Sequence, residues 1–491
     1  MAQTPSPSTS SFQTLPIHII HNIVEYVLDA YNAYKRSNAH AFSILHSCHR
    51  WREALKDSKY VYLKLGYDVQ DGLTSEISGP GFGDCSGLPA LSIADKAKKM
   101  QLSPGFYYGV FNGRFLDALL QSEYAGLVFP SVKKLEMLFL DPSEESDAPC
   151  LDTQEDKDNA QQETMRFVQH LRAMLPNFTS ISIDWEYDIS AYTHDDPAPI
   201  LNKMICGLVD GIKNVAYLDS EDLLGDITFD PDAFSGLTSF HYFFKDADER
   251  GLDIILRNSS TLQDITAEEM PSNFIDRMLY RENGECIVYD CLKSLYLFCP
   301  KGNMSPNTED YTCHFPSLKK LKVYGSDPVL TNALFNGSEQ LEYLSLWNTY
   351  DTVDGISDWQ SSRVCQLRNL RHLVLYYKCK SSQVMLNDNP GKISQYSRFV
   401  EDMIKQPRCL QSISLTSSRY EARVVDILST SALLSNIQKL DLTMKAVRFK
   451  DIVAVIGNCS QLKAIAFSAI NDYPFIDGMK GEELVRHLET R

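Results

Sequence analysis

The chain has 491 residues, too many for one compact domain, and 44% of them are hydrophobic, too large a fraction for a disordered protein. Its 47 basic and 64 acidic residues give a net charge of −17, which disfavours nonspecific binding to nucleic acid or to an anionic membrane. No apolar run approaches the roughly 18 residues of a transmembrane helix, so we expect neither nucleic acid nor membrane as a partner.

A polar N-terminus is followed by two amphipathic segments. Residues 1–11 have neither the basic nor the apolar region of a secretory signal, so we expect a flexible tail on a cytoplasmic and/or nuclear protein. From Leu15 onward, apolar residues three and four apart predict a helix with Pro16 in its first turn. A second helical stretch runs from Ala41 to Trp51, and residues 60–65 resemble a short strand or a final turn.

Two further stretches, which begin at residues 66 and 141, have the composition of irregular structure. Residues 66–126 begin with many glycines and predict a Gly-rich linker that leads into the following domain. Residues 141–158 contain many carboxylates and little that can pack, so we expect an acidic disordered loop over about 141–163.

A short phrase then recurs over residues 127–470: apolar, two variable, apolar, one variable, apolar. Clear copies are Leu318-Lys-Lys-Leu321-Lys-Val323 and Leu370-Arg-His-Leu373-Val-Leu375. Most of the intervals between copies are 23 to 30 residues, close to the period of leucine-rich repeats. The middle apolar residues of the twelve copies are Leu135, Ile181, Val215, Phe240, Ile265, Leu295, Leu321, Leu344, Leu373, Ile413, Leu440 and Ile465.

The phrase predicts one strand per repeat, because apolar residues two apart on a strand point into the same interior. Amphipathic stretches at 248–258, 398–406 and 450–458 predict helices on the other side. We therefore expect an α/β fold, a curved leucine-rich-repeat solenoid with a parallel sheet on its concave face, helices outside and a C-terminal cap helix over 471–491. An ordinary α/β domain with similar strands is the alternative.

The N-terminal segment resembles an F-box. The resemblance depends on Leu15-Pro16, the Ile-rich helix that follows, and Leu45-His-Ser-Cys48-His-Arg-Trp51, and it covers residues 12–65. The interval from Leu15 to Trp51 is several residues longer than is usual in that family. An F-box followed by leucine-rich repeats is similar to the substrate receptors of SCF-type (Skp–cullin–F-box) ubiquitin ligases.

This resemblance implies a non-catalytic protein without a cofactor, which binds a Skp-type adaptor, through it a cullin, and an unknown protein substrate. Carried over by position, the adaptor-binding residues would be Leu15, Pro16, Ile19, Ile20, Ile23, Leu45 and Trp51. The alternative is a leucine-rich-repeat scaffold that acts independently of ubiquitination, in which the N-terminal helices only cap the repeats.

A substrate would meet the outward positions of the repeat strands, the third, fifth and seventh of the phrase. Aromatic and basic residues gather there on four neighbouring strands, a composition typical of binding surfaces. A long insertion at 301–314 that covers them is the alternative. The predicted substrate-binding residues are Tyr296, Phe298, Lys320, Lys322, Tyr324, Tyr343, Trp347, His372 and Tyr376.

The remaining candidates for chemistry are weak. Twelve scattered cysteines without paired C-x-x-C motifs predict reduced thiols and no zinc site. The pairs His18/His21 and His46/His49 have helical ligand spacing, but they lie in the predicted helices, where a polar-face histidine is the simpler interpretation. Because no nucleophile–base motif occurs in the sequence either, we expect no catalytic or metal-binding residues.

Overall fold

The computed structural model describes only part of the chain, in two compact units within residues 1–237 and 238–491. The described residues are 61–68, 72–78, 93–94, 97–104, 106–107, 110–111, 113–139, 153–185, 198–219, 231–243, 250–268, 270, 274–281, 283–298, 314–324, 340–350, 367–379, 409–417, 426, 428–429, 435–444, 455, 457 and 459–469.

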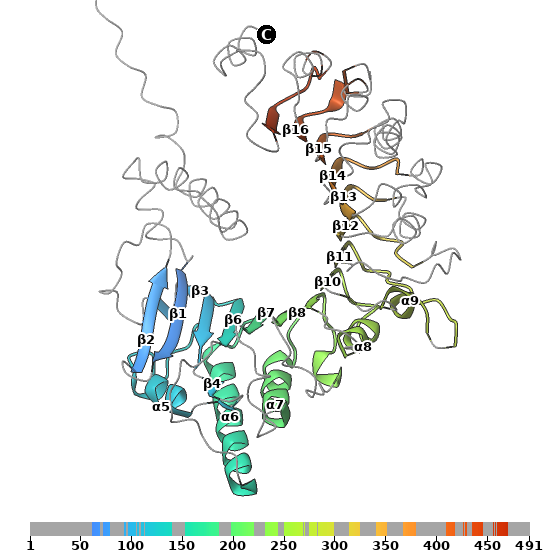
Figure 1. Cartoon of the computed structure of the whole chain (residues 1–491). Coiled ribbons are helices and arrows are strands. Elements are labelled where there is room, and N and C mark those ends of the chain that lie inside the picture. Colours follow the sequence, from blue (N-terminus) through green and yellow to red (C-terminus); the bar gives the residue numbers. More distant parts are fainter. Residues whose placement is uncertain are drawn as a thin grey trace, which may run out of the picture. The chain divides into compact units, whose positions relative to one another are not determined.

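The first unit contains a sheet with the strand order β2-β1-β3-β6-β7-β8 (Figure 1). Its strands are parallel except β2, which pairs antiparallel with β1. The strands are β1 (Val61–Asp68), β2 (Gly72–Ser78), β3 (Ala97–Ser103), β6 (Lys134–Phe139), β7 (Ser180–Trp185) and β8 (Asn214–Asp219), with a separate hairpin of β4 (Phe106–Tyr107) and β5 (Val110–Phe111). The helices are α5 (Gly113–Gln121), α6 (Gln154–Met174), α7 (Ala198–Val209) and the 3-10 helix η3 (Pro231–Phe234).

The second unit is a run of parallel strands in chain order, one per repeat. They are β9 (Ser239–Phe243), β10 (Asp264–Glu268), β11 (Ser294–Phe298), β12 (Lys320–Tyr324), β13 (Tyr343–Tyr350), β14 (His372–Cys379), β15 (Ser412–Ser417), β16 (Lys439–Met444) and β17 (Ala464–Ala469). Helices α8 (Arg250–Arg257) and α9 (Phe274–Leu279) belong to the same unit. All twelve strands expected from the repeat phrase are confirmed as β6 to β17, and α8 confirms the helix expected at 248–258.

The repeat phrase forms strands because its apolar residues alternate inward. Leu321 and Val323 of β12, like Leu344 of β13, are buried, whereas Lys320 and Lys322, which alternate with the two β12 residues, are exposed. Burial of such an aliphatic side chain contributes roughly 1.5–3 kcal/mol, so each strand adds to one shared core.

The start of most repeat strands is held by a fork of backbone hydrogen bonds. The N–H groups of Lys319 and Lys320 both donate to the carbonyl oxygen of Lys293, each at 2.9 Å. In the next repeat, Glu342 and Tyr343 donate in the same way to Lys319, at 2.8 and 2.9 Å. This fork recurs at β7, β8 and β10 to β17, and it locks adjacent repeats into one register.

A turn before several strands adds another buried apolar position to the phrase. Leu318 N–H donates to the carbonyl oxygen of Phe315 at 3.2 Å, and Leu292 N–H donates to that of Tyr289 at 3.2 Å. Phe315 and Tyr289 are both buried, three residues before the first leucine of their copies. We did not predict this position, because aromatic and aliphatic residues alternate there and blur the pattern.

The linker expected at 66–126 needs correction. Its described residues include β2, β3 and α5, and the preceding β1 also lies in the sheet. Leu63 and Leu65 on β1, and Met100 and Leu102 on β3, are buried at the two inward positions of the repeat phrase. The repeats therefore begin at Val61. β1 and β3 are two further copies of the phrase, which we did not predict because the glycines between them indicated a linker.

The acidic loop expected at about 141–163 is also wrong from residue 153 onward. Helix α6 begins directly after Thr153, whose side chain accepts a hydrogen bond from Asp156 N–H at 3.1 Å, while the Asp156 carboxylate accepts one from Thr153 N–H at 3.2 Å. This capping box stabilises the first turn of the helix, and acidic residues are favourable at a helix N-terminus. The acidic composition therefore marks the start of a helix here. The buried face of α6 consists of Thr164, Phe167, Val168, Leu171 and Met174.

The predicted flexible tail, most of the F-box-like module and the predicted C-terminal cap helix lie outside the described residues. Of the range 12–65, only 61–65 is described, and it belongs to β1. The helix expected at 398–406 lies outside as well, and the one at 450–458 is described only at helical residues 455 and 457.

Candidate binding surface

The outward side chains of β11 to β14 form one surface of the second unit. The strands pair so that Phe298, Tyr324, Trp347 and Tyr376 occupy equivalent positions in four neighbouring strands. Two residues earlier on β12, β13 and β14 lie Lys322, Ser345 and Val374. The structure therefore brings the nine predicted substrate-binding residues onto the same side of consecutive strands, and we call these nine the aromatic surface.

Four rings of the aromatic surface form a continuous row. Phe298 and Tyr324 stack with centroids 4.3 Å apart and an interplanar angle of 11°, and Trp347 stacks on Tyr376 at 4.7 Å and 16°. Tyr324 and Trp347 join the two pairs at 5.8 Å with a tilt of 39°. Such contacts add about 0.5–1.5 kcal/mol each beyond their buried area, so the row is held rigid before any partner arrives. We call these four residues the ring row.

Cations lie among the remaining rings. The Lys322 ammonium is 5.8 Å from the centroid of the Tyr296 ring and 5.9 Å from that of Tyr343, within the range of cation–π attraction. The Tyr343 ring in turn contacts the His372 ring at 6.2 Å. The surface thus presents positive charge that its own rings hold in position.

Trp347 is the most exposed large ring of this surface, with 39% of its area accessible. Its indole N–H donates to the Ser345 hydroxyl at 3.0 Å, and Ser345 itself is buried beneath it. The indole orientation is therefore fixed by one hydrogen bond and two ring contacts. A rigid, partly exposed tryptophan with its polar atom satisfied is typical of an interface anchor.

Burial and nearby charges shift the pKa values of two ionisable groups of the surface. Burial, and then the negative charge of Glu268, raise the pKa of the Tyr296 hydroxyl, which therefore stays neutral. Burial lowers the pKa of His372, and the positive charges of Arg371, Lys439 and Lys320 act in the same direction, although Glu342 opposes them. At neutral pH the His372 ring is therefore mainly uncharged.

Two elements of the prediction lie wholly or mostly outside the described residues. Of the insertion at 301–314 that could cover the surface, only His314 is described, and it is buried. The predicted adaptor-binding residues Leu15, Pro16, Ile19, Ile20, Ile23, Leu45 and Trp51 also lie outside the described part of the chain.

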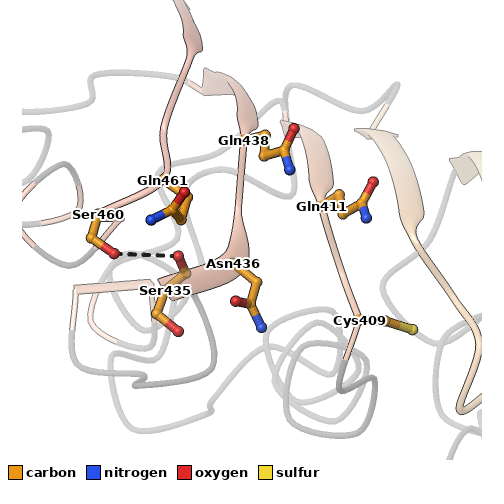
Figure 2. A pocket seen from close by; sticks show the side chains of 7 residues that line it. All are labelled: Cys409, Gln411, Ser435, Asn436, Gln438, Ser460 and Gln461. Atoms are coloured by element: carbon orange, nitrogen blue, oxygen red, sulfur yellow. Dashed lines mark hydrogen bonds between the residues drawn. The ribbon is translucent and has the colours of Figure 1, made fainter.

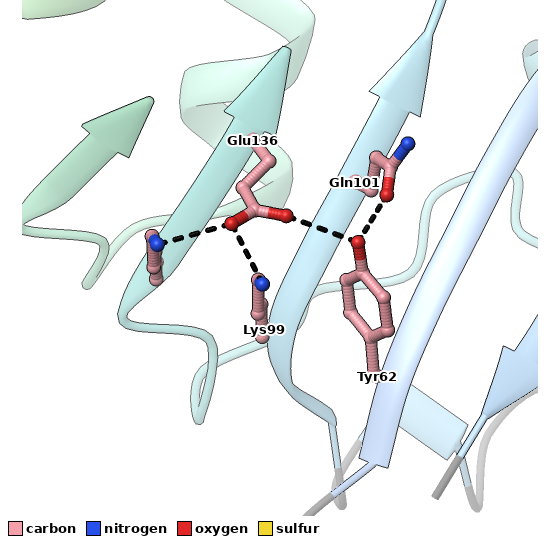
Figure 3. A network of polar contacts seen from close by, with 5 residues as sticks. Tyr62, Lys99, Gln101 and Glu136 are labelled. Atoms are coloured by element: carbon pink, nitrogen blue, oxygen red, sulfur yellow. Dashed lines mark hydrogen bonds and ion pairs between the residues drawn. The ribbon is translucent and has the colours of Figure 1, made fainter. Parts of the chain in front are cut away.

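A polar network that we did not predict lies on the sheet of the first unit (Figure 3). Glu136 on β6 forms ion pairs with Lys99 of β3 at 2.6 Å and with Lys134 at 3.0 Å, and it accepts a hydrogen bond from the Tyr62 hydroxyl of β1 at 3.0 Å. The Tyr62 hydroxyl also contacts the Gln101 amide oxygen. Desolvation raises the pKa of Glu136, but the hydrogen bond from Lys99 and the charge of Lys134 outweigh it and lower the pKa overall. These residues occupy outward positions of β1, β3 and β6. Recognition of the repeat phrase in β1 and β3 would have indicated them.

A polar pocket of about 440 Å³ lies where β15, β16 and β17 begin (Figure 2). Its lining provides amides and hydroxyls together with the Cys409 thiol, which donates to the carbonyl oxygen of Arg368 at 3.1 Å. None of the lining residues has an Asp, Glu, Lys, Arg or His side chain. The lining residues are Cys409, Gln411, Ser435, Asn436, Gln438, Ser460 and Gln461.

Within the described ranges, no group of three or more His, Cys, Asp or Glu side chains is placed to hold a metal ion. In the same part of the chain, no helix is both long and apolar enough to cross a membrane. Burial raises the pKa of the Cys459 thiol to about 11, so this cysteine is a weak nucleophile at neutral pH.

Comparisons with known proteins found similar solved structures but no matching sequence. No family model and no curated protein matches the sequence. A chain of the crystal structure of the Rad7–Elc1 complex from yeast is similar over 96% of this chain and 98% of its own length, with 13% sequence identity and a TM-score of 0.38. The proposals that follow rest on the residues of this chain.

Proposed function

We propose that this chain is the substrate-recognition subunit of an SCF-type ubiquitin ligase. In this proposal an F-box formed by residues 12–60 docks on a Skp-type adaptor, which connects to a cullin. The repeats form a solenoid that holds a protein substrate on its strand face. The chain itself would be non-catalytic and free of cofactors, and it would act in the cytoplasm and/or nucleus, with ubiquitin transferred by partner subunits.

The observation that carries this proposal is the aromatic surface. Rings that stack across consecutive strands, with lysines between them and Trp347 partly exposed, are built to bind a protein partner rather than to complete the core. Support for the adaptor comes from the resemblance of residues 15–51 to an F-box. Because residues 61–65 belong to β1, the proposal limits this module to residues 12–60.

The test is affinity purification of the full-length chain from native cytosol, followed by mass spectrometry for the adaptor and the cullin. The double variant Leu15→Ala/Pro16→Ala should lower adaptor recovery at least tenfold, because truncation of buried anchors costs about 2 kcal/mol or more. Trp347→Ala, which changes the aromatic surface only, serves as the control and should recover adaptor normally. Full-length chain that recovers neither adaptor nor cullin would refute the proposal and favour the free-standing scaffold.

A further inference from the structure

A row of cations lies next to the ring row. The strand pairing aligns Lys320 of β12, Tyr343 of β13, His372 of β14, Ser412 of β15 and Lys439 of β16 at equivalent positions. The basic residues therefore occupy alternate strands, about 10 Å apart, since neighbouring strands are about 4.8 Å apart. We call Lys320, His372 and Lys439 the cation row; its two lysines supply the positive charge, and His372, whose pKa is lowered, supplies a ring N–H between them. It runs parallel to the ring row.

The two lysines of the cation row form no ion pair with a described carboxylate. Glu342 is paired with Lys319 at 3.1 Å, and Asp441, which keeps its negative charge, accepts a hydrogen bond from the Ser414 hydroxyl at 3.2 Å. No carboxylate of the described residues pairs with Lys320 or Lys439, and both side chains are exposed.

The two central rings of the ring row are flanked by other rings on both sides. Tyr324 lies between Phe298 and Trp347, and Trp347 lies between Tyr324 and Tyr376, so the faces of these two rings are directed at other rings. The edges of such rings carry partial positive charge. Stacking of nucleic-acid bases needs open faces, and the chain's net charge of −17 further disfavours a polyanion as long as nucleic acid.

We propose that the aromatic surface and Lys439 bind an acidic peptide segment, whose carboxylate or phosphate groups meet the cation row while an aromatic or long apolar side chain packs on the ring row. The charge spacing suits this occupant, because one turn of polyproline II spans three residues and about 9.3 Å. Acidic side chains at positions i, i+3 and i+6 would then face Lys320, His372 and Lys439. This inference deepens the substrate-binding role proposed above and rests on it.

The experiment selects peptides from a phage-displayed library of random segments of about 12 residues on the immobilised full-length chain. We expect enrichment of acidic residues at a spacing of three, together with an aromatic residue or leucine. A synthetic copy of an enriched peptide is then measured by fluorescence anisotropy. Replacement of its acidic residues by Gln should weaken binding at least tenfold, and a copy with phosphoserine at those positions distinguishes phosphate from carboxylate recognition.

Two charge-reversed variants of the protein make the test specific. Lys320→Glu/Lys439→Glu should weaken the acidic peptide at least tenfold and should favour a copy of the peptide with Lys at the acidic positions. The matched control Lys133→Glu/Lys203→Glu changes the net charge equally at two other exposed lysines, before β6 and on α7, and should change affinity less than twofold.

Several results would overturn the inference: enrichment of neutral or basic peptides, no enrichment, or equal losses in the two charge-reversed variants. Tighter binding of an oligothymidylate than of the best peptide, lost in Lys320→Glu/Lys439→Glu, would reassign the surface to nucleic acid. The Leu15→Ala/Pro16→Ala variant should bind the peptide normally. Failure of adaptor docking is thereby separated from failure of peptide recognition.

Discussion

Trp347 and Leu344 are neighbours on β13 with opposite roles. Leu344 is fully buried, so Leu344→Ala should destabilise the fold by about 2–5 kcal/mol. Trp347→Ala should cost about 1 kcal/mol of stability, because it removes ring contacts with Tyr324 and Tyr376, and about 2 kcal/mol or more of partner binding. Thermal melting beside partner capture for the two variants checks this. A Trp347→Ala protein that melts as low as Leu344→Ala would show that the ring is structural.

His314 makes stability depend on pH. Its side chain is fully buried, with Nδ1 2.5 Å from the carbonyl oxygen of Ile287 and its ring 5.1 Å from that of Tyr280. Burial lowers its pKa from 6.5, although the backbone hydrogen bond opposes this. A lowered pKa in the folded state means that the unfolded chain binds more protons, so stability is complete above pH 6.5 and falls as the pH drops toward the lowered value.

We expect His314→Gln to reduce that acid sensitivity, because Gln can donate the same hydrogen bond but does not titrate. The measurement is the midpoint of urea unfolding between pH 8 and pH 5 for both proteins. The variant should be less stable at pH 8 and should lose less stability on acidification. His170 and His372, whose pKa values are also lowered by burial, titrate in both proteins and cancel in the comparison. Parallel pH profiles would assign the acid sensitivity to other groups.

At the scale of the elements, helix α6 depends on its first turn. Thr153→Ala removes the side chain that accepts from Asp156 N–H and should destabilise the first unit by about 1 kcal/mol. Asp156→Ala removes the reciprocal bond and an acidic residue near the helix N-terminus. The double variant should cost less than the sum of the single variants, because both act on the same capping box. Additive losses of thermal stability would mean that the two residues act independently.

The side chain of Arg172 joins the C-terminal end of α6 to α7. The Arg172 guanidinium donates to the carbonyl oxygens of Gly207 at 3.0 Å and Leu208 at 2.8 Å, in the last turn of α7. These carbonyl groups have no partner within their own helix, and the helix dipole favours a cation there. Arg172 thus joins two helices that lie in different repeats. The amphipathic pattern of α6 or of α7 alone does not indicate this contact.

At the scale of the whole molecule, the boundary between the F-box-like module and the repeats can be tested by truncation. A chain that begins at residue 61 keeps β1 and should melt within a few degrees of the full-length protein. A chain that begins at residue 69 lacks β1, whose Leu63 and Leu65 are buried, and leaves β3 without its neighbour. We expect its melting temperature to be clearly lower and its tendency to aggregate greater, because the new edge exposes backbone and apolar side chains. Equal melting of the two truncated chains would place the start of the repeats later.

The sequence by itself determined the repeat, the twelve strands β6 to β17, and which residues of a strand face inward, such as Leu321, or outward, such as Lys322. These properties follow from local alternation within a few residues. Tertiary structure decided what depends on pairing between strands more than 20 residues apart. The register alone shows that Tyr324 meets Phe298 and Trp347, and that Lys439 continues the line of Lys320 and His372.

Local composition was misleading at two places for the same physical reason. The glycines after β1 and the carboxylates before α6 favour irregular chain when they are considered alone. Burial of Leu63 against its neighbours, and the reciprocal bonds of Thr153 and Asp156, supply free energy that composition does not reveal. The repeat pattern is a short-range property, and the sequence therefore determined it; the edges of the fold and the shape of its binding surface depend on contacts that only the folded chain makes.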